Sequence, residues 1–148
     1  MRLVIDTNVL LSAVMSSASP SAQIFALWSS RKFDLLTAAE QIEEIARVTR
    51  YPKIRARLAP ALAGRLVNRL RDVAIVLENL PKVDVASDPS DNYLLALAEA
   101  GHADFLVSGD KALLGLKRHK SAQIVAPSAL LGSLKDQGHH GRPARTRT

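Results

Sequence analysis

Near its start the chain reads Leu3-Val4-Ile5-Asp6-Thr7-Asn8-Val9-Leu10-Leu11, a short apolar run that ends in an acid and passes into a helical pattern. A later run, Phe105-Leu106-Val107-Ser108-Gly109-Asp110, has the same arrangement. Short apolar runs of this kind are typical of strands buried within a parallel sheet. The carboxyl ends of such strands lie at the edge where open α/β sheets place their sites. We therefore expect Asp6 and Asp110 to meet at that edge.

Strand-like and helix-like segments alternate along the rest of the chain. Further strands are predicted over residues 33–36, 83–85 and 124–126. Helices are predicted over residues 7–15, from Ser19-Pro20 through Trp28, from Thr37 to Tyr51-Pro52, and over residues 58–80, 92–100, 111–116 and 127–134. The third helix should begin with a capping box made by Thr37 and Glu40. The alternation predicts an α/β fold with a central parallel sheet and helices on both faces.

Composition restricts the class of protein. A chain of 148 residues with 47% hydrophobic content fits one folded domain, which we assign to residues 1–134. The absence of cysteine excludes disulfides and thiolate metal sites. The start lacks the pattern of a signal peptide, and no apolar stretch approaches the roughly 18 to 20 residues of a membrane span. We expect a soluble, cytoplasmic protein without a membrane partner.

The formal charge of +6 favours a polyanionic partner. Half of this excess lies in residues 135–148, which hold four basic residues against one acid and show no apolar periodicity. We expect this tail to be disordered. It could serve as a solubilising terminus or contact nucleic acid, and the composition does not separate the two.

Two further acids are candidates for the same site. Asp91 opens the helix over residues 92–100, and Glu44 lies in the third helix. Periodicity does not decide between Asp88 and Asp91, or between Glu43 and Glu44. Asp6 could also be a simple helix N-cap, although the repeat of its setting at Asp110 argues for more than capping.

The chemistry of several acids at one sheet edge points to a cation. Unpaired carboxylates repel one another unless a hard divalent ion neutralises them. Asn8 and Ser108 could orient the acids by hydrogen bonding. The four histidines show no ligand spacing tied to the acids. The sequence therefore predicts a divalent-metal site.

Four separated motifs resemble the PIN-domain family, in particular its VapC-like toxins, in order and spacing. They are Val4-Ile5-Asp6-Thr7-Asn8-Val9-Leu10, Glu44-Ile45 followed by Tyr51-Pro52-Lys53, Asp88-Pro89-Ser90-Asp91-Asn92, and Leu106-Val107-Ser108-Gly109-Asp110. The resemblance covers about residues 2–131 and favours Glu44 over Glu43. The basic tail is a departure, because the family pattern does not require it.

The resemblance implies a metal-dependent endoribonuclease that leaves 5′-phosphate and 3′-hydroxyl ends. Mg²⁺ or Mn²⁺ would be held by Asp6, Asp91 and Asp110, with Glu44 completing the acidic pocket. The basic residues Arg47, Arg50, Lys53 and Arg55 would hold flanking phosphates of the RNA substrate. The implied partner is an antitoxin protein. Such toxins commonly form homodimers, although no segment here specifies one.

Two other functions remain as alternatives. A phosphatase or receiver-like phosphoryl-transfer enzyme could use a similar sheet, but Asp6 is followed by Thr7 and Asn8, so there is no Asp-x-Asp pair. A non-catalytic RNA-binding or protein-interaction module could also keep this fold. Retention of all four acids favours catalysis.

Overall fold

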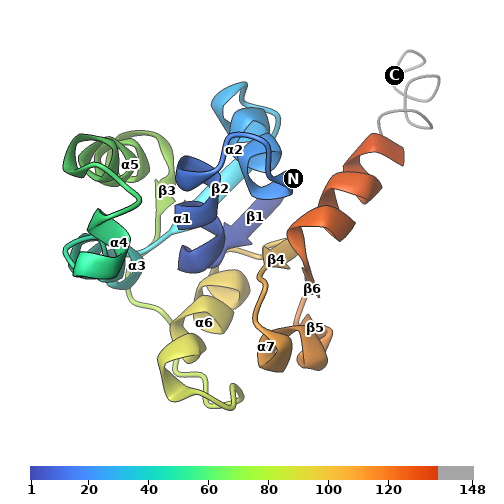
Figure 1. The fold of residues 1–148 in the computed structure, drawn as a ribbon. Coiled ribbons are helices and arrows are strands. Elements are labelled where there is room, and N and C mark those ends of the chain that lie inside the picture. Colours follow the sequence, from blue (N-terminus) through green and yellow to red (C-terminus); the bar gives the residue numbers. More distant parts are fainter. Residues whose placement is uncertain (137–148) are drawn as a thin grey trace.

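A six-stranded sheet forms the centre of the protein, in a computed structural model that describes residues 1–136 (Figure 1). The strand order is β3-β2-β1-β4-β6-β5. All neighbouring strands pair in parallel except β5 and β6, which are antiparallel. The strands are β1 (Arg2–Ile5), β2 (Asp34–Thr37), β3 (Ile75–Val76), β4 (Phe105–Val107), β5 (Arg118–His119) and β6 (Ala122–Val125). The predicted α/β fold is confirmed, with one antiparallel edge strand as the exception.

Helices connect the strands and cover both faces of the sheet. They are α1 (Thr7–Met15), α2 (Pro20–Ser29), α3 (Ala39–Val48), α4 (Pro52–Arg55), α5 (Pro60–Val73), the 3₁₀ turn η1 (Pro89–Asp91), α6 (Asn92–Ala100) and α7 (Lys111–Leu116). A last helix runs over residues 127–136. The start of α2 follows the sequence closely, since the Ser19 hydroxyl accepts a hydrogen bond from the Ala22 N–H at 3.1 Å and Pro20 occupies the first turn.

Alternate residues of the central strands belong to two separate hydrophobic cores, one on each face of the sheet. Leu3, Ile5 and Leu35 point to one face, where they pack with apolar residues of α1, α2, α3, α5 and the last helix. Val4 and Leu36 point to the other face, against α6 and α7. This alternation follows from the two-residue period of a strand. Burial on both faces explains why the central strands are continuous apolar runs.

Two predictions of local structure were wrong. Thr37 does not cap the third helix, because β2 continues through it and its buried hydroxyl donates to Gln41 Oε1 at 2.7 Å. Ala38 takes the N-cap position without a side-chain bond. Residues 83–85 do not form a strand. The main-chain N–H groups of Val85 and Ala86 both donate to the Asn92 side-chain oxygen, at 3.1 and 2.8 Å. These bonds attach the segment to the start of α6 instead of to a neighbouring strand.

The segment predicted as helix over residues 58–80 is shorter in the structure, because α5 ends at Val73 and the chain then enters β3. Strand β3 was not predicted, and neither was β5. Each has only two residues, which is too short for a periodic pattern to be read. Both lie at edges of the sheet.

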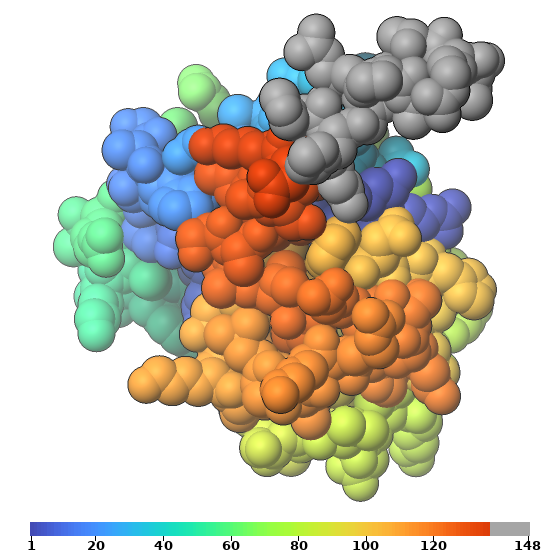
Figure 2. Space-filling model, turned by 90° about the vertical axis from the view of Figure 1, so that its right-hand side faces the viewer, coloured from blue at the N-terminus to red at the C-terminus, as the bar shows by residue number. Residues whose placement is uncertain are grey.

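The C-terminal quarter of the described chain forms most of one side of the molecule. The space-filling view shows residues from β4 through the last helix covering most of this face (Figure 2). The predicted tail starts at residue 135, but residues 135 and 136 still belong to the last helix. The rest of the tail, residues 137–148, lies outside the described part of the chain. Within residues 1–136, no single helix is long and apolar enough to cross a membrane; α1 and α2 reach that length only as a pair bent by 93°.

Candidate active site

Asp6 lies where β1 passes into α1. It is 8% exposed. One carboxylate oxygen accepts a hydrogen bond from the main-chain N–H of Asn8 at 3.5 Å, and the other accepts from the Ser108 hydroxyl at 2.8 Å. Asp6 is therefore the N-cap of α1, as one interpretation of the sequence proposed, but capping occupies only one of its oxygens. Asn8 contacts it through the main chain.

Ser108 joins Asp6 to Asp110. Strands β1 and β4 are neighbours in register, with Ile5 opposite Val107, so the residues that follow each strand meet at one edge. The Ser108 hydroxyl donates to Asp6 and also accepts from the main-chain N–H of Asp110 at 3.0 Å. Asp110 itself caps α7, because its Oδ1 accepts from Ala112 N–H at 2.9 Å.

The structure separates Asp88 from Asp91. Asp88 is the N-cap of η1, and its Oδ1 accepts hydrogen bonds from the N–H and hydroxyl of Ser90 at 3.0 and 2.9 Å. These two bonds lower the pKa of Asp88. Asp91 instead faces the other acids. Burial, then the charge of Asp6 and the close approach of Asp110, raise the pKa of Asp91 to about 6.

Glu44 is held by two hydroxyl groups. Its Oε1 accepts hydrogen bonds from Thr7 and Tyr93, each at 2.6 Å, and these two hydroxyls lie 3.3 Å apart. Burial and the bond to Glu44 raise the pKa of Tyr93, so it stays a donor. Since both donors meet the same oxygen, Oε2 of Glu44 is left for another ligand. Glu43, next to it on α3, is exposed.

The acids act on one another electrostatically. Burial raises the pKa of Asp6, and the nearby carboxylates of Glu44 and Asp110 add to this rise, while the bonds from Ser108 and Asn8 oppose it. Raised carboxyl pKa values mean that the ionised forms are unfavourable without a counter-charge. An open cavity of about 450 Å³ lies beside them, lined in part by Asp6 and Asp110.

The donor set suits a hard divalent cation by its chemistry. Carboxylate oxygens without sulfur ligands match Mg²⁺ or Mn²⁺. Within residues 1–136, however, no three Asp, Glu or His side chains are grouped closely enough to hold a metal ion by themselves. Mg²⁺ commonly binds through one or two carboxylates and keeps several waters. An open group of acids beside a cavity is compatible with that kind of binding.

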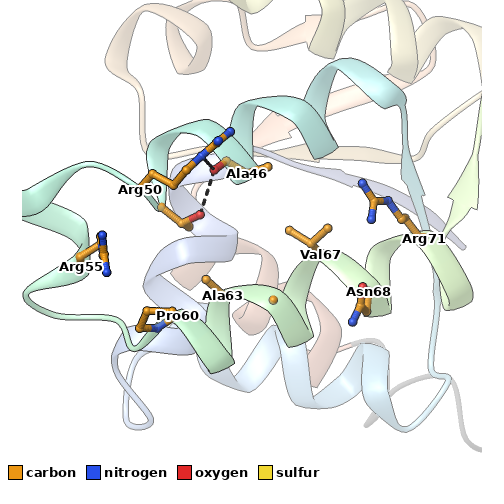
Figure 3. A pocket seen from close by; sticks show the side chains of 10 residues that line it. Ala46, Arg50, Arg55, Pro60, Ala63, Val67, Asn68 and Arg71 are labelled. Atoms are coloured by element: carbon orange, nitrogen blue, oxygen red, sulfur yellow. Dashed lines mark hydrogen bonds between the residues drawn. The ribbon is translucent and has the colours of Figure 1, made fainter.

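Two of the four basic residues expected to hold RNA line a common cavity, and the other two are exposed on helices. Arg47 is exposed on α3 one turn after Glu44, on a similar side of the helix. Lys53 is exposed on α4. Arg50 and Arg55 line a different cavity, of about 550 Å³, between α3, α4 and α5 (Figure 3). This cavity shares no lining residue with the one beside Asp6.

Tyr93 is the residue of this site that the sequence did not reveal. It lies two residues after Asp91 in the first turn of α6, within an apolar helix where an aromatic residue is normally part of the core. Only its hydrogen bond to Glu44, which is 49 positions away, distinguishes it. The sequence signal that could have identified Tyr93 is its place two positions after a candidate metal ligand, because the hydroxyl of a buried tyrosine usually finds a hydrogen-bond partner.

A family profile described as PIN domain matches residues 2–112. The chain is a member of the PIN-domain family. The matched range includes all four acids of the site. Comparison with curated proteins gave no match.

Among solved structures, this PIN domain is similar to a chain in the crystal structure of VapBC2 from Rickettsia felis bound to a DNA fragment from their promoter. The TM-score is 0.56 at 11% sequence identity, and the alignment covers 85% of this chain and 98% of the other. At this identity the likeness shows the fold alone. The fold resemblance inferred from four short motifs is confirmed.

Proposed function

We propose that this PIN domain is a metal-dependent endoribonuclease of the cytoplasm and the toxin of a toxin–antitoxin pair. The observation that supports the proposal is the position of Asp6 and Asp110 at one sheet edge, joined through Ser108, together with the raised pKa values of Asp6 and Asp91. PIN domains are generally nucleases, and the site keeps the acids that such chemistry needs. RNA is the expected substrate by family resemblance.

Asp6, Asp91 and Asp110 would hold Mg²⁺ or Mn²⁺, with Glu44 bound directly or through water. The bound ion would supply a counter-charge for the phosphodiester and an activated water. The Ser108 hydroxyl donates to the Asp6 carboxylate and accepts from the main-chain N–H of Asp110, which ties the two positions together. Thr7 and Tyr93 fix Glu44 by its Oε1. The chain thus orients its acids before the substrate binds, which reduces the reorganisation needed during reaction.

An antitoxin is the expected protein partner. The similar structure is that of a VapBC complex, which supports a partner of this class. An antitoxin segment with a basic side chain would neutralise the acids that the metal otherwise neutralises. A homodimer is a further expectation from the resemblance.

The proposal is tested by cleavage of single-stranded RNA by the purified protein, with Mg²⁺ or Mn²⁺ and with EDTA. We expect cleavage only with metal, and its loss in Asp6→Asn and Asp110→Asn. Two matched pairs sharpen the assignment. Asp91→Asn should lose most activity while Asp88→Asn keeps it, and Glu44→Gln should lose most activity while Glu43→Gln keeps it.

Efficient cleavage by Asp6→Asn in excess Mg²⁺ would remove these acids from the mechanism. RNA binding without cleavage by the wild type at any metal concentration would favour the non-catalytic module instead.

A further inference from the structure

The basic charge of the folded chain is concentrated in one unit. Residues 45–71 hold eight Lys and Arg side chains and no acid, whereas the whole chain has a net charge of +6. The rest of the chain therefore has a net charge of −2. The basic residues are Arg47, Arg50, Lys53, Arg55, Arg57, Arg65, Arg69 and Arg71. Within residues 1–136, none of them forms an ion pair with a carboxylate.

Three of these arginines line the cavity between α3, α4 and α5. Figure 3 shows Arg50 and Arg55 at one end, Arg71 at the other, and Ala63 and Val67 between them. The Nε of Arg50 donates to the Ala46 carbonyl at 2.9 Å, which anchors the side chain while its terminal nitrogens remain as donors. The cavity is thus an elongated, open groove with guanidinium groups at both ends. We call it the α3–α5 groove.

Small residues make the middle of the groove accessible. Ala46 lies on α3, and Ala63 and Gly64 lie opposite on α5. A larger side chain at these positions would fill the space between the helices. The Asn68 amide, also in the lining, adds a hydrogen-bond donor and acceptor. A groove with charge at its ends and space between them suits an extended polyanion better than one small anion.

Helix α3 separates the groove from the acids. Glu44 and Ala46 are two positions apart, which places them about 200° apart around the helix. Glu44 faces Thr7 and Tyr93, whereas Ala46 faces the groove. A strand bound in the groove must therefore pass around α3 to reach the acids. Arg47, exposed on the Glu44 side of α3, lies between the two places.

We propose that the α3–α5 groove is a second binding site for single-stranded RNA, which holds backbone phosphates at a distance from the scissile bond. This inference rests on the proposed ribonuclease function for the identity of the polymer. Guanidinium groups are suited to phosphates because they donate in a planar fork. RNA long enough to reach both places binds more tightly than RNA that reaches only the acids.

The test is RNA binding by the full chain, measured by fluorescence anisotropy in EDTA so that no cleavage occurs. The groove variant is Arg55→Gln with Arg71→Gln. Its matched control is Arg57→Gln with Arg65→Gln, which removes the same charge from exposed positions of the same unit outside the groove lining. The probes are single strands of about 4 and about 16 nucleotides, within the usual range of site sizes.

For the longer strand we expect the groove variant to lose about tenfold in affinity at 0.15 M salt, and its salt slope to fall by about 1.4, at roughly 0.7 for each phosphate contact. The control should change by less than about threefold, because salt screens charges that do not contact the strand. The shorter strand should bind the wild type more weakly than the longer strand does, because it makes fewer phosphate contacts. Equal melting temperatures will show that the variants fold; if the double variant does not, Arg55→Gln alone serves.

Equal losses in the groove variant and the control would overturn the proposal, because general charge would then explain binding. Loss of binding to polyglutamate without loss of RNA binding would also overturn it, in favour of an acidic protein segment. The binding measurement uses no metal and does not depend on cleavage. If the protein proved to have no ribonuclease activity, the measurement would therefore still decide whether the groove binds RNA.

Discussion

At the scale of single residues, the geometry of the site depends on which carboxylate oxygen of each acid already accepts hydrogen bonds from the protein. Thr7 and Tyr93 both bond to Oε1 of Glu44, so one oxygen is fixed and the other is available. Asp6 gives one oxygen to Ser108 and the other to its capping bond. Sequence patterns identify that an acid follows a strand, but they do not identify the atoms that hold it.

Tyr93→Phe should lower ribonuclease activity by about 10- to 100-fold, as is usual when a group that orients a ligand is lost. The substitution removes the hydroxyl and keeps the ring, so the packing of α6 should be preserved. RNA cleavage at several Mg²⁺ concentrations will show the effect as a higher metal requirement. Tyr51→Phe, on an exposed tyrosine distant in the sequence from α6, is the control. Unchanged metal dependence would mean that Glu44 does not need this bond.

Asp91 predicts a pH effect on the stability of the metal-free protein. Its folded pKa is about 6 against an ordinary value of 3.8, so the folded state binds the proton more tightly than the unfolded state. The free energy of unfolding should therefore fall as pH rises from about 4 to above 6, by about 1 kcal/mol after allowance for solvent screening. In chemical denaturation with EDTA, Asp91→Asn should gain stability relative to the wild type over this range. A constant difference between the two proteins would show that Asp91 is not crowded by other acids.

At the scale of elements, the long strands and helices could be predicted because their patterns extend over several residues. The spans of α1, α6 and α7 match the predicted ranges. The failures have a shared physical reason. Thr37 and residues 83–85 had suitable propensity, but they are paired with the side chains of Gln41 and Asn92. A pattern of apolar and polar residues does not show which side chain forms such a bond.

Gly101 ends α6 against the sheet, where an added Cβ would overlap the Leu36 side chain and lie 3.0 Å from Leu77. We expect Gly101→Ala to destabilise the protein by about 1 to 3 kcal/mol, the usual range for overpacking a core. Gly64→Ala is the matched control, because a Cβ there meets nothing within 4 Å and alanine favours a helix. Denaturation midpoints will compare them. Equal stability of the two variants would mean that Leu36 moves aside without cost.

At the scale of the whole molecule, Asp6 and Asp110 come together because β1 and β4 are neighbours. Glu44 of α3 is tied to the same region by its bonds to Thr7 of α1 and Tyr93 of α6. The meeting of Asp6 and Asp110 could be predicted from strand ends. The position of Glu44 could be predicted only by family resemblance, since an acid on an amphipathic helix is normally solvated. The division of the arginines between two sides of α3 depends on the rotation of that helix, which the predicted range did not specify.

The proposed toxin function predicts an effect on growth. Expression of the wild type alone should slow bacterial growth more than expression of Asp6→Asn at the same protein level, because only the wild type would cleave cellular RNA. Co-expression of a small neighbouring gene for an antitoxin should relieve the effect. Growth curves with protein levels checked by immunoblot measure both. Equal growth of the two strains would contradict the toxin function. It would not contradict a ribonuclease function, which RNA cleavage in vitro tests separately.

The late position of β4 in the chain has a consequence for synthesis. Strand β4 inserts between β1 and β6, and it brings Ser108 and Asp110 to Asp6. A ribosome that has made only the first hundred residues has therefore produced a chain with no complete site. The proposed nuclease activity would therefore arise only after most of the chain has emerged, and the ribosomal RNA would not be exposed to it during translation of the earlier part.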